Sequence, residues 1–368
     1  MNAPQSSAHT HAHVAEPGSW LRPGRFGALC AGRDNNFNLL RMLAASGVLI
    51  SHAYPIALGP DVTEPLERAL GGVTLGTVCV YVFFAISGFF ITQSFERTST
   101  LGRFLRARAL RLFPALAVVL VLTVAIGAGL TVAGTAAYWG AAPDYVLRNL
   151  ALFVLRWELP GVFTDNPYGG AINGSLWTLS YEVLCYAGVT LLGLAGILRR
   201  KWAVAIALAL IVAGYFVLQE IRFNSRVYLL FQLGLPFALG AAAYVWRDRI
   251  VLDARIALGL ALLALAIRLV PGAEPLFRPV FVLALSYATF WLGYLPVPAL
   301  RAYNRLGDYS YGVYIYAFPA QQLVAHWGAV TPGANMALAA LIVLPCAVLS
   351  WHLIEKPALA LKASPRRV

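Results

Sequence analysis

The sequence has few charged residues. Only 12 % of its 368 residues are Asp, Glu, Lys or Arg, whereas 60 % are apolar or aromatic; soluble domains carry about 25 % charged residues. A water-soluble fold of this length would need more polar surface to cover its core. The apolar residues also gather in runs of roughly 18–25, the length that crosses about 30 Å of hydrocarbon. The composition therefore excludes a soluble globule and predicts an all-α integral membrane protein.

Cysteine is also scarce. The four cysteines, Cys30, Cys79, Cys185 and Cys346, are scattered and form no CxxC or Cys/His spacing, so neither a disulfide framework nor a metal site is indicated. The first 33 residues contain no apolar segment like that of a secretory signal. Their polar composition predicts a disordered, basic cytoplasmic leader over residues 1–33.

Ten apolar runs follow the leader. We expect about ten transmembrane helices, because most runs reach the length that spans a bilayer. The runs lie at roughly 36–58, 72–94, 111–133, 175–198, 202–219, 226–246, 255–270, 276–295, 307–328 and 334–355. The seventh is short enough to be tilted or only partly inserted. The longest connection, 134–174, is expected to be irregular or interfacial, and loops of this length are often functional.

Basic residues lie mainly on one side of these runs. The net charge of +12 comes from 28 Lys and Arg against 16 Asp and Glu, and the basic residues cluster before the first run and after the second, fourth and tenth. The positive-inside rule then places both termini in the cytoplasm. The charge is therefore a topology signal, and no nucleic-acid partner is expected. A membrane domain at 34–360 is followed by a short basic cytoplasmic tail at 361–368.

Three ionisable residues inside the runs are functional candidates, because a charge in hydrocarbon is costly. Arg41 and His52 are about three turns apart on the first run, so they share one face at a spacing of about 16 Å. Glu182 lies one to two turns into the fourth run, at a depth similar to His52. A His–Glu pair would satisfy both groups and form a general base. The alternatives are a lipid anchor for Arg41, a helix–helix hydrogen bond for His52 and a purely structural His–Glu pair.

Two shorter segments each allow two interpretations. Ser87 and Gly88 favour a small-residue packing notch over a nucleophile, since no GxSxG motif surrounds them. In the basic stretch 103–114, helical spacing would put Arg108 and Arg111 on one face. That face would either lie on anionic lipid or bind phosphate groups.

Six short segments occur in order along the chain. They are Asn38–Arg41 (NLLR) with His52 eleven residues after Arg41, Val82–Phe89 (VFFAISGF), Arg108–Pro114 (RALRLFP), Ser175–Glu182 (SLWTLSYE), Leu306–Tyr314 (LGDYSYGVY) and Ile354–Pro357 (IEKP). Together they resemble the acyltransferase-3 family of membrane acyltransferases over residues 33–360. We interpret the last two as an aromatic-rich helix start and a charged helix stop. Two features depart from the family pattern. A His that many members carry after the Tyr motif is missing at Tyr314–Pro319, and no soluble SGNH-type domain is appended.

The resemblance implies a multi-pass protein of the inner (plasma) membrane that transfers an acyl group, usually acetyl, from cytoplasmic acyl-CoA to a hydroxyl of a cell-surface glycan, as in exopolysaccharide biosynthesis. No permanently bound cofactor and no metal are expected; acyl-CoA is the donor substrate, and the acceptor is a glycan or lipid-linked glycan. Arg41, Arg108 and Arg111 would bind the donor, with His52 as general base and Glu182 positioning it. A covalent acyl-His52 intermediate stays open. A transporter or flippase for a lipid-linked glycan is the alternative function.

Overall fold

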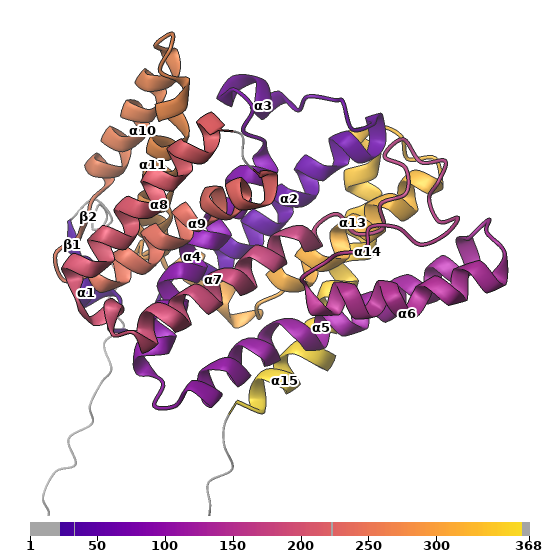
Figure 1. Ribbon diagram of the computed structural model, residues 1–368, viewed down its shortest axis with the longest axis horizontal. Coiled ribbons are helices and arrows are strands. Elements are labelled where there is room, and N and C mark those ends of the chain that lie inside the picture. The colour runs from indigo at the N-terminus through magenta and orange to yellow at the C-terminus, as the bar shows by residue number, and fades with distance from the viewer. Residues whose placement is uncertain (1–22, 33, 222–223, 363–368) are drawn as a thin grey trace, which may run out of the picture.

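Most of the structure is helical (Figure 1). The computed structural model describes residues 23–32, 34–221 and 224–362. The longer helices are α2 (Phe37–Leu58), α4 (Leu75–Arg97), α5 (Leu101–Leu130), α6 (Thr135–Ala151), α7 (Leu176–Leu194), α8 (Lys201–Ile221), α9 (Ser225–Val245), α10 (Ala254–Leu269), α11 (Glu274–Gly293), α13 (Ser310–His326) and α14 (Pro332–Ser350). The short elements are β1 (Gly24–Arg25), α1 (Phe26–Leu29), α3 (Pro65–Leu70), β2 (Val251–Leu252), α12 (Pro298–Ala302) and α15 (Lys356–Ala360).

Eight helices of the described chain are long and apolar enough to cross a membrane. The last of them, Pro332–Ala360, joins α14, a π-helical turn and α15 into one helix. Helices α10 and α13 occupy the seventh and ninth predicted spans but have only 16 and 17 residues. The prediction of an all-α membrane protein is confirmed. Eight of the ten predicted spans are found as helices long and apolar enough to cross a membrane, and the helices at the seventh and ninth predicted spans are shorter than that.

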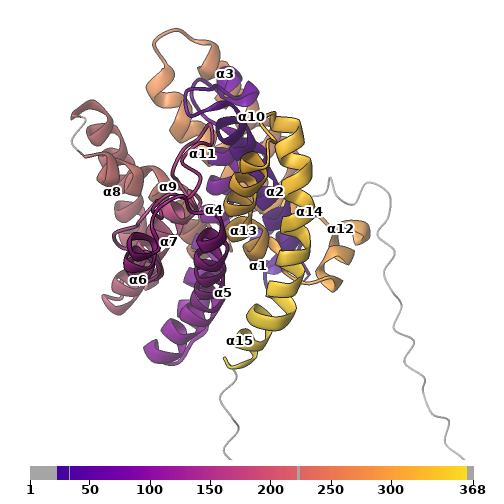
Figure 2. The ribbon, with the colours of Figure 1, turned by 90° about the vertical axis from the view of Figure 1, so that its right-hand side faces the viewer.

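Helix α13 lies at the centre of the bundle, beside α2 and α14 (Figure 2). All but three of its 17 residues are buried. Its polar side chains bond to neighbouring elements: the Gln321 amide donates to the Leu49 carbonyl of α2 at 2.8 Å, and the Asn173 amide before α7 donates to the Ile315 carbonyl of α13 at 3.0 Å. Such bonds hold helices together where the hydrophobic effect does not. They fix the middle of α2 and the segment before α7 relative to α13.

Helices α4 and α9 pack at very short range through two glycines. A Cβ built on Gly88 would lie 1.9 Å from the Phe237 carbonyl oxygen, and one on Gly240 would lie 2.1 Å from the Ala85 carbonyl oxygen. Only glycine permits this approach. The packing notch predicted at Ser87-Gly88 is confirmed for Gly88, while the Ser87 side chain points elsewhere.

Two predicted irregular regions are partly ordered. Residues 23–32 belong to the predicted disordered leader, yet β1 pairs with β2, and the ring of Phe26 is buried against Phe89 and Phe290. The leader prediction is therefore wrong for this part; residues 1–22 and Arg33 lie outside the described residues, as do 363–368 of the predicted tail. The predicted loop 134–174 contains α6, which packs along α5 (Figure 1). Tyr138 of α6 is buried, and its hydroxyl donates to the Val124 carbonyl of α5 at 2.5 Å.

Candidate functional site

Two cavities lie at opposite ends of α2. The arginine cavity, of about 440 Å³, surrounds Arg41, four residues after the start of α2, and also receives Arg108, Arg111 and Glu182. The histidine cavity, of about 470 Å³, surrounds His52, six residues before the end of α2. The start of α5 and the end of the α14–α15 helix border the first cavity, and the starts of α4 and α7 border the second. The two cavities therefore lie toward opposite faces of the bundle.

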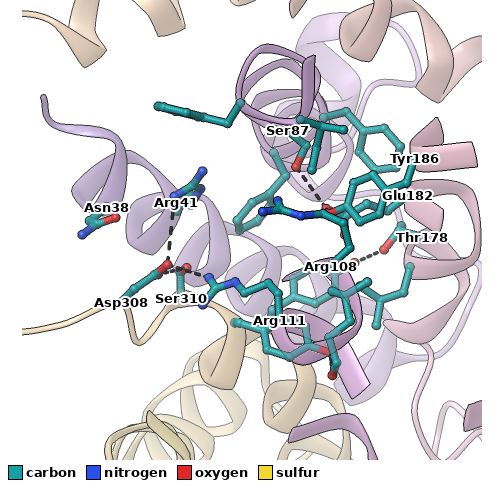
Figure 3. Close-up of a pocket in the computed structure, with 18 of the residues that line it drawn as sticks. Asn38, Arg41, Ser87, Arg108, Arg111, Thr178, Glu182, Tyr186, Asp308 and Ser310 are labelled. Atoms are coloured by element: carbon teal, nitrogen blue, oxygen red, sulfur yellow. Dashed lines mark hydrogen bonds and ion pairs between the residues drawn. The ribbon is translucent and has the colours of Figure 1, made fainter. Parts of the chain in front are cut away.

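The arginine cavity is built around a network of ion pairs (Figure 3). An Asp308 carboxylate oxygen lies 2.5 Å from a guanidinium nitrogen of Arg111 and 4.0 Å from one of Arg41. A second nitrogen of Arg111 lies 3.6 Å from a carboxylate oxygen of Glu355, which is 2 % exposed. Arg111 thus connects the start of α5 to the residues before α13 and to the π-helical turn after α14. Its charge is matched by protein carboxylates.

Arg108 differs from these two arginines. Among the described residues it has no carboxylate within 4 Å and no hydrogen-bond partner, and its Nε atom is buried. Figure 3 shows its side chain between the Asp308 group and Glu182. Helix α5 begins ten residues before the predicted span, so the basic stretch forms its first turns. Arg103 and Arg106 are exposed on the other face, while Arg108 and Arg111 enter the cavity. The stretch therefore has an exposed pair, Arg103 and Arg106, and a pair that lines the cavity, Arg108 and Arg111.

Glu182 accepts hydrogen bonds inside the arginine cavity. The Ser87 hydroxyl of α4 donates to it at 3.0 Å, and the Tyr186 hydroxyl, one turn further along α7, donates to the same oxygen. Both donors come from α4 and α7, the helices that form this wall of the cavity (Figure 3). These bonds hold the carboxylate at a fixed position facing Arg108. Sequence reasoning named Glu182 but did not identify Ser87 or Tyr186 as its partners; the i, i+4 spacing of Tyr186 was the available signal.

His52 faces a different set of groups. Its ring contacts Phe318 of α13 edge-on at 5.3 Å between centroids, and within the described chain its buried Nδ1 atom has no hydrogen-bond partner. Glu64, which is 4 % exposed, lines the same cavity; it accepts from the Ser51 hydroxyl at 2.6 Å and from the backbone N–H of Leu75. A carboxylate at the first N–H of α4 is favourable because helix N-termini carry unpaired donors and partial positive charge. Glu64 therefore anchors the segment before α3 over this cavity.

The predicted direct contact between His52 and Glu182 is not present. In the part of the chain that the structure describes, Glu182 bonds to Ser87 and Tyr186, and it lines the arginine cavity, which His52 does not. Similar depth on two helices does not bring two side chains together, because the rotation of each helix about its axis decides which cavity a residue enters. The structure thus brings Arg41, Arg108, Arg111 and Glu182 together and places His52 apart.

Two acidic residues of the site were missed. Asp308 lies in the segment interpreted as an aromatic-rich helix start, and Glu355 in the one interpreted as a helix stop. The helix continues past Pro357 to Ala360, and Glu355 is buried beside Arg111. The rule that ionisable residues in apolar surroundings are functional candidates would have found both.

The arginines of this cavity also change the pKa values of Asp308 and Lys362, which lie outside the spanning helices. Burial by itself would raise the pKa of Asp308, but the guanidinium groups of Arg111 and Arg41 outweigh it and hold that pKa below its usual range. Asp308 is therefore ionised at neutral pH. Burial and the positive charges of Arg108 and Arg111 lower the pKa of Lys362, at the mouth of the cavity, to about 8. Lys362 can thus lose its charge in a mildly alkaline medium.

The fold and its two cavities define a helical membrane protein with a cationic site and a histidine site, and comparison with known proteins identifies its class. The chain belongs to the acyltransferase-3 family: the family's model, described as an acyltransferase domain, matches residues 34–354. The protein is therefore a membrane acyltransferase.

Two relatives match nearly the whole chain. An O-acetyl transferase of Shigella phage Sf6 is 30 % identical over 340 residues, covering 91 % of this chain and 98 % of the relative. Nodulation protein 10 of Rhizobium leguminosarum bv. viciae is 30 % identical over 366 residues, covering 91 % and 95 %. No solved structure matches the chain. The similarity favours the enzymatic interpretation over a transporter or flippase.

Proposed function

We propose that this protein moves an acetyl-type acyl group from cytoplasmic acyl-CoA to a hydroxyl of a cell-surface or exported polysaccharide. The observation that carries the proposal is the pair of cavities, which share a wall formed by Val80, Thr178 and Tyr314. A donor in one cavity and an acceptor in the other would meet at this wall. The relative named O-acetyl transferase supports the acetyl group, and the basic residues near the arginine cavity support its position at the cytoplasmic face.

The arginine cavity suits the donor. Coenzyme A carries several phosphate charges, and guanidinium groups bind phosphate oxygens with paired hydrogen bonds. Of the three arginines in the described cavity, Arg108 is the one without a carboxylate partner, and Lys362 lies at the mouth. Arg41 and Arg111, already paired with Asp308, shape the cavity and add to its positive potential. Glu182, fixed by Ser87 and Tyr186, lines the same cavity and adds a negative charge on the side of Arg108 that faces away from Asp308.

The histidine cavity suits a polyhydroxylated acceptor. Besides His52 it is lined by Glu67, Gln232, Tyr168 and Trp177, which provide hydrogen-bonding groups and aromatic faces, and the described residues around it include no Lys or Arg. The buried Nδ1 of His52 has no hydrogen-bond partner among the described residues, and His52 is the base for the acceptor hydroxyl. Since Glu182 lies in the other cavity, His52 acts without a carboxylate partner from α7.

The test uses purified protein in proteoliposomes with radiolabelled acetyl-CoA supplied on one side only. We expect label in the glycan fraction when acetyl-CoA faces the arginine cavity, and a glycan mass increase of one acetyl group per modified unit. Glycan that crosses the bilayer without gaining mass would contradict the proposal and indicate a flippase. Label that stays on the protein when no acceptor is present, and disappears in His52→Ala, would indicate a covalent acyl-His52 step instead of direct transfer.

A further inference from the structure

The wall between the two cavities carries a pair of hydroxyl groups. Thr178, in the first turn of α7, and Tyr314, on α13, line both cavities, and their hydroxyls are hydrogen-bonded to each other. Both also lie near one backbone carbonyl, that of Ser175, at 3.2 Å from the Thr178 oxygen and 3.1 Å from the Tyr314 oxygen. Val80, the third residue of the wall, offers only methyl groups. The wall is therefore polar at one place only.

This place is close to the histidine. Phe318, whose ring contacts His52, is one helical turn after Tyr314 on α13, so the two rings lie on the same face of that helix. The Tyr314 ring is held from the other side by Phe83 of α4, edge-on at 5.7 Å between centroids. Thr178 is held by the start of α7, which the Asn173 amide fastens to α13. The two hydroxyls are thus held by packed helices, between the arginine cavity, which contains Glu182, and the histidine cavity, which contains His52.

Acyl transfer is promoted by hydrogen-bond donors that bind the carbonyl oxygen of the acyl group. When a hydroxyl attacks a thioester, negative charge develops on the carbonyl oxygen, and fixed donors that bind this oxygen stabilise the transition state. Each hydroxyl of the pair has one proton and can rotate it from the Ser175 carbonyl, or from its partner, toward an incoming oxygen. No backbone movement is required.

We propose that Thr178 and Tyr314 donate hydrogen bonds to the acyl carbonyl oxygen during transfer, an inference that rests on the proposed function. The acceptor oxygen forms a bond to the carbonyl carbon while His52 takes its proton, and the displaced electron pair collects on the carbonyl oxygen that the two hydroxyls bind. The carbonyl then re-forms, the carbon–sulfur bond breaks, and the coenzyme A thiolate receives the proton from His52. The pair acts on the reacting atoms and not on the phosphates of the donor.

The test replaces single hydroxyls and separates kcat from donor binding. Tyr314→Phe and Thr178→Val should each lower kcat about 10²-fold, within the range for loss of one such donor, while the Kd for coenzyme A stays within twofold. Thr178→Ser, which keeps a hydroxyl, should recover most of the rate. Tyr316→Phe is the matched control, since this buried tyrosine of the same helix faces a different cavity; its kcat should be near that of the wild type.

The outcomes distinguish this inference from the proposed function. If the wild type transfers the acyl group and Tyr314→Phe keeps its kcat, or loses no more kcat than Tyr316→Phe does, the role of the hydroxyl pair is overturned. The proposed function then still stands. A loss of coenzyme A affinity as large as the loss of rate would make the pair part of the donor site and also overturns it. A wild-type protein that transfers no acyl group overturns the proposed function and this inference with it.

Discussion

The two cavities are built on opposite electrostatic principles. In the arginine cavity, side chains from α2, α5 and the segments around α13 and α14 are tied together by ion pairs through Asp308 and Glu355. In the histidine cavity, Glu64 is held by a hydroxyl and a backbone donor, and among the described residues the Nδ1 atom of His52 has no hydrogen-bond partner. The first cavity is arranged to hold charge, whereas the second keeps a base available. This difference is the basis for proposing polyanion binding at one end of the bundle and proton transfer at the other.

The largest effect should come from the histidine cavity. His52→Ala should lower kcat by about 10²- to 10⁴-fold, the usual contribution of a general base, while coenzyme A binding stays unchanged because the arginine cavity is intact. Transfer rates and coenzyme A affinity would be measured on the same purified sample. His326→Ala is the control: this histidine ends α13, contacts Phe163 and lines neither cavity. Full activity of His52→Ala at normal membrane abundance would remove His52 from the mechanism.

Within the arginine cavity, Arg111 should matter for stability. Arg111→Gln leaves the buried Glu355 without its countercharge, and breaking a buried ion pair from one side costs about 3–5 kcal/mol of folding stability. We expect a clearly lower melting temperature in detergent and lower membrane abundance. Adding Glu355→Gln to Arg111→Gln should restore part of the melting temperature, because the buried carboxylate is then neutral while Asp308 still pairs with Arg41. An Arg111→Gln protein with an unchanged melting temperature and weaker donor binding would instead make Arg111 a phosphate ligand.

Arg108 should show the reverse behaviour. Arg108→Gln should raise the Kd for coenzyme A about 10- to 100-fold, as expected for hydrogen bonds to a charged group worth about 1.5–3 kcal/mol, without lowering the melting temperature. Equilibrium binding of labelled coenzyme A in nanodiscs measures the change. Arg106→Gln, on the exposed face of the same helix, is the matched control and should bind normally. If both variants bind equally well, the donor does not use this part of the cavity.

These contrasts also mark what the sequence could and could not predict. Runs of apolar residues identify the helices because length and hydropathy are local properties, and the spacing of Arg41 and His52 correctly placed them toward opposite ends of α2. The contact of His52 with Glu182 could not be settled in the same way, because it depends on how α2 and α7 rotate and pack around α13. Asp308 is a different case. Its position beside an apolar run was visible, but the sequence does not reveal that two arginines from distant segments meet it.

The smallest expected effect concerns Lys362. It tests whether the positive charge of the arginine cavity contributes to coenzyme A binding. Because the pKa of Lys362 is lowered to about 8 by burial and by the nearby Arg108 and Arg111, this side chain is charged below pH 8 and loses its charge as the pH rises through that value. Its attraction for a polyanion is therefore present at pH 7 and lost by pH 9. We expect the Kd of the wild type for coenzyme A to rise a few-fold between these pH values, and the Kd of Lys362→Met to be higher at pH 7 but nearly constant. A Kd that rises equally in both proteins would assign the pH dependence to another group and leave Lys362 outside the donor site.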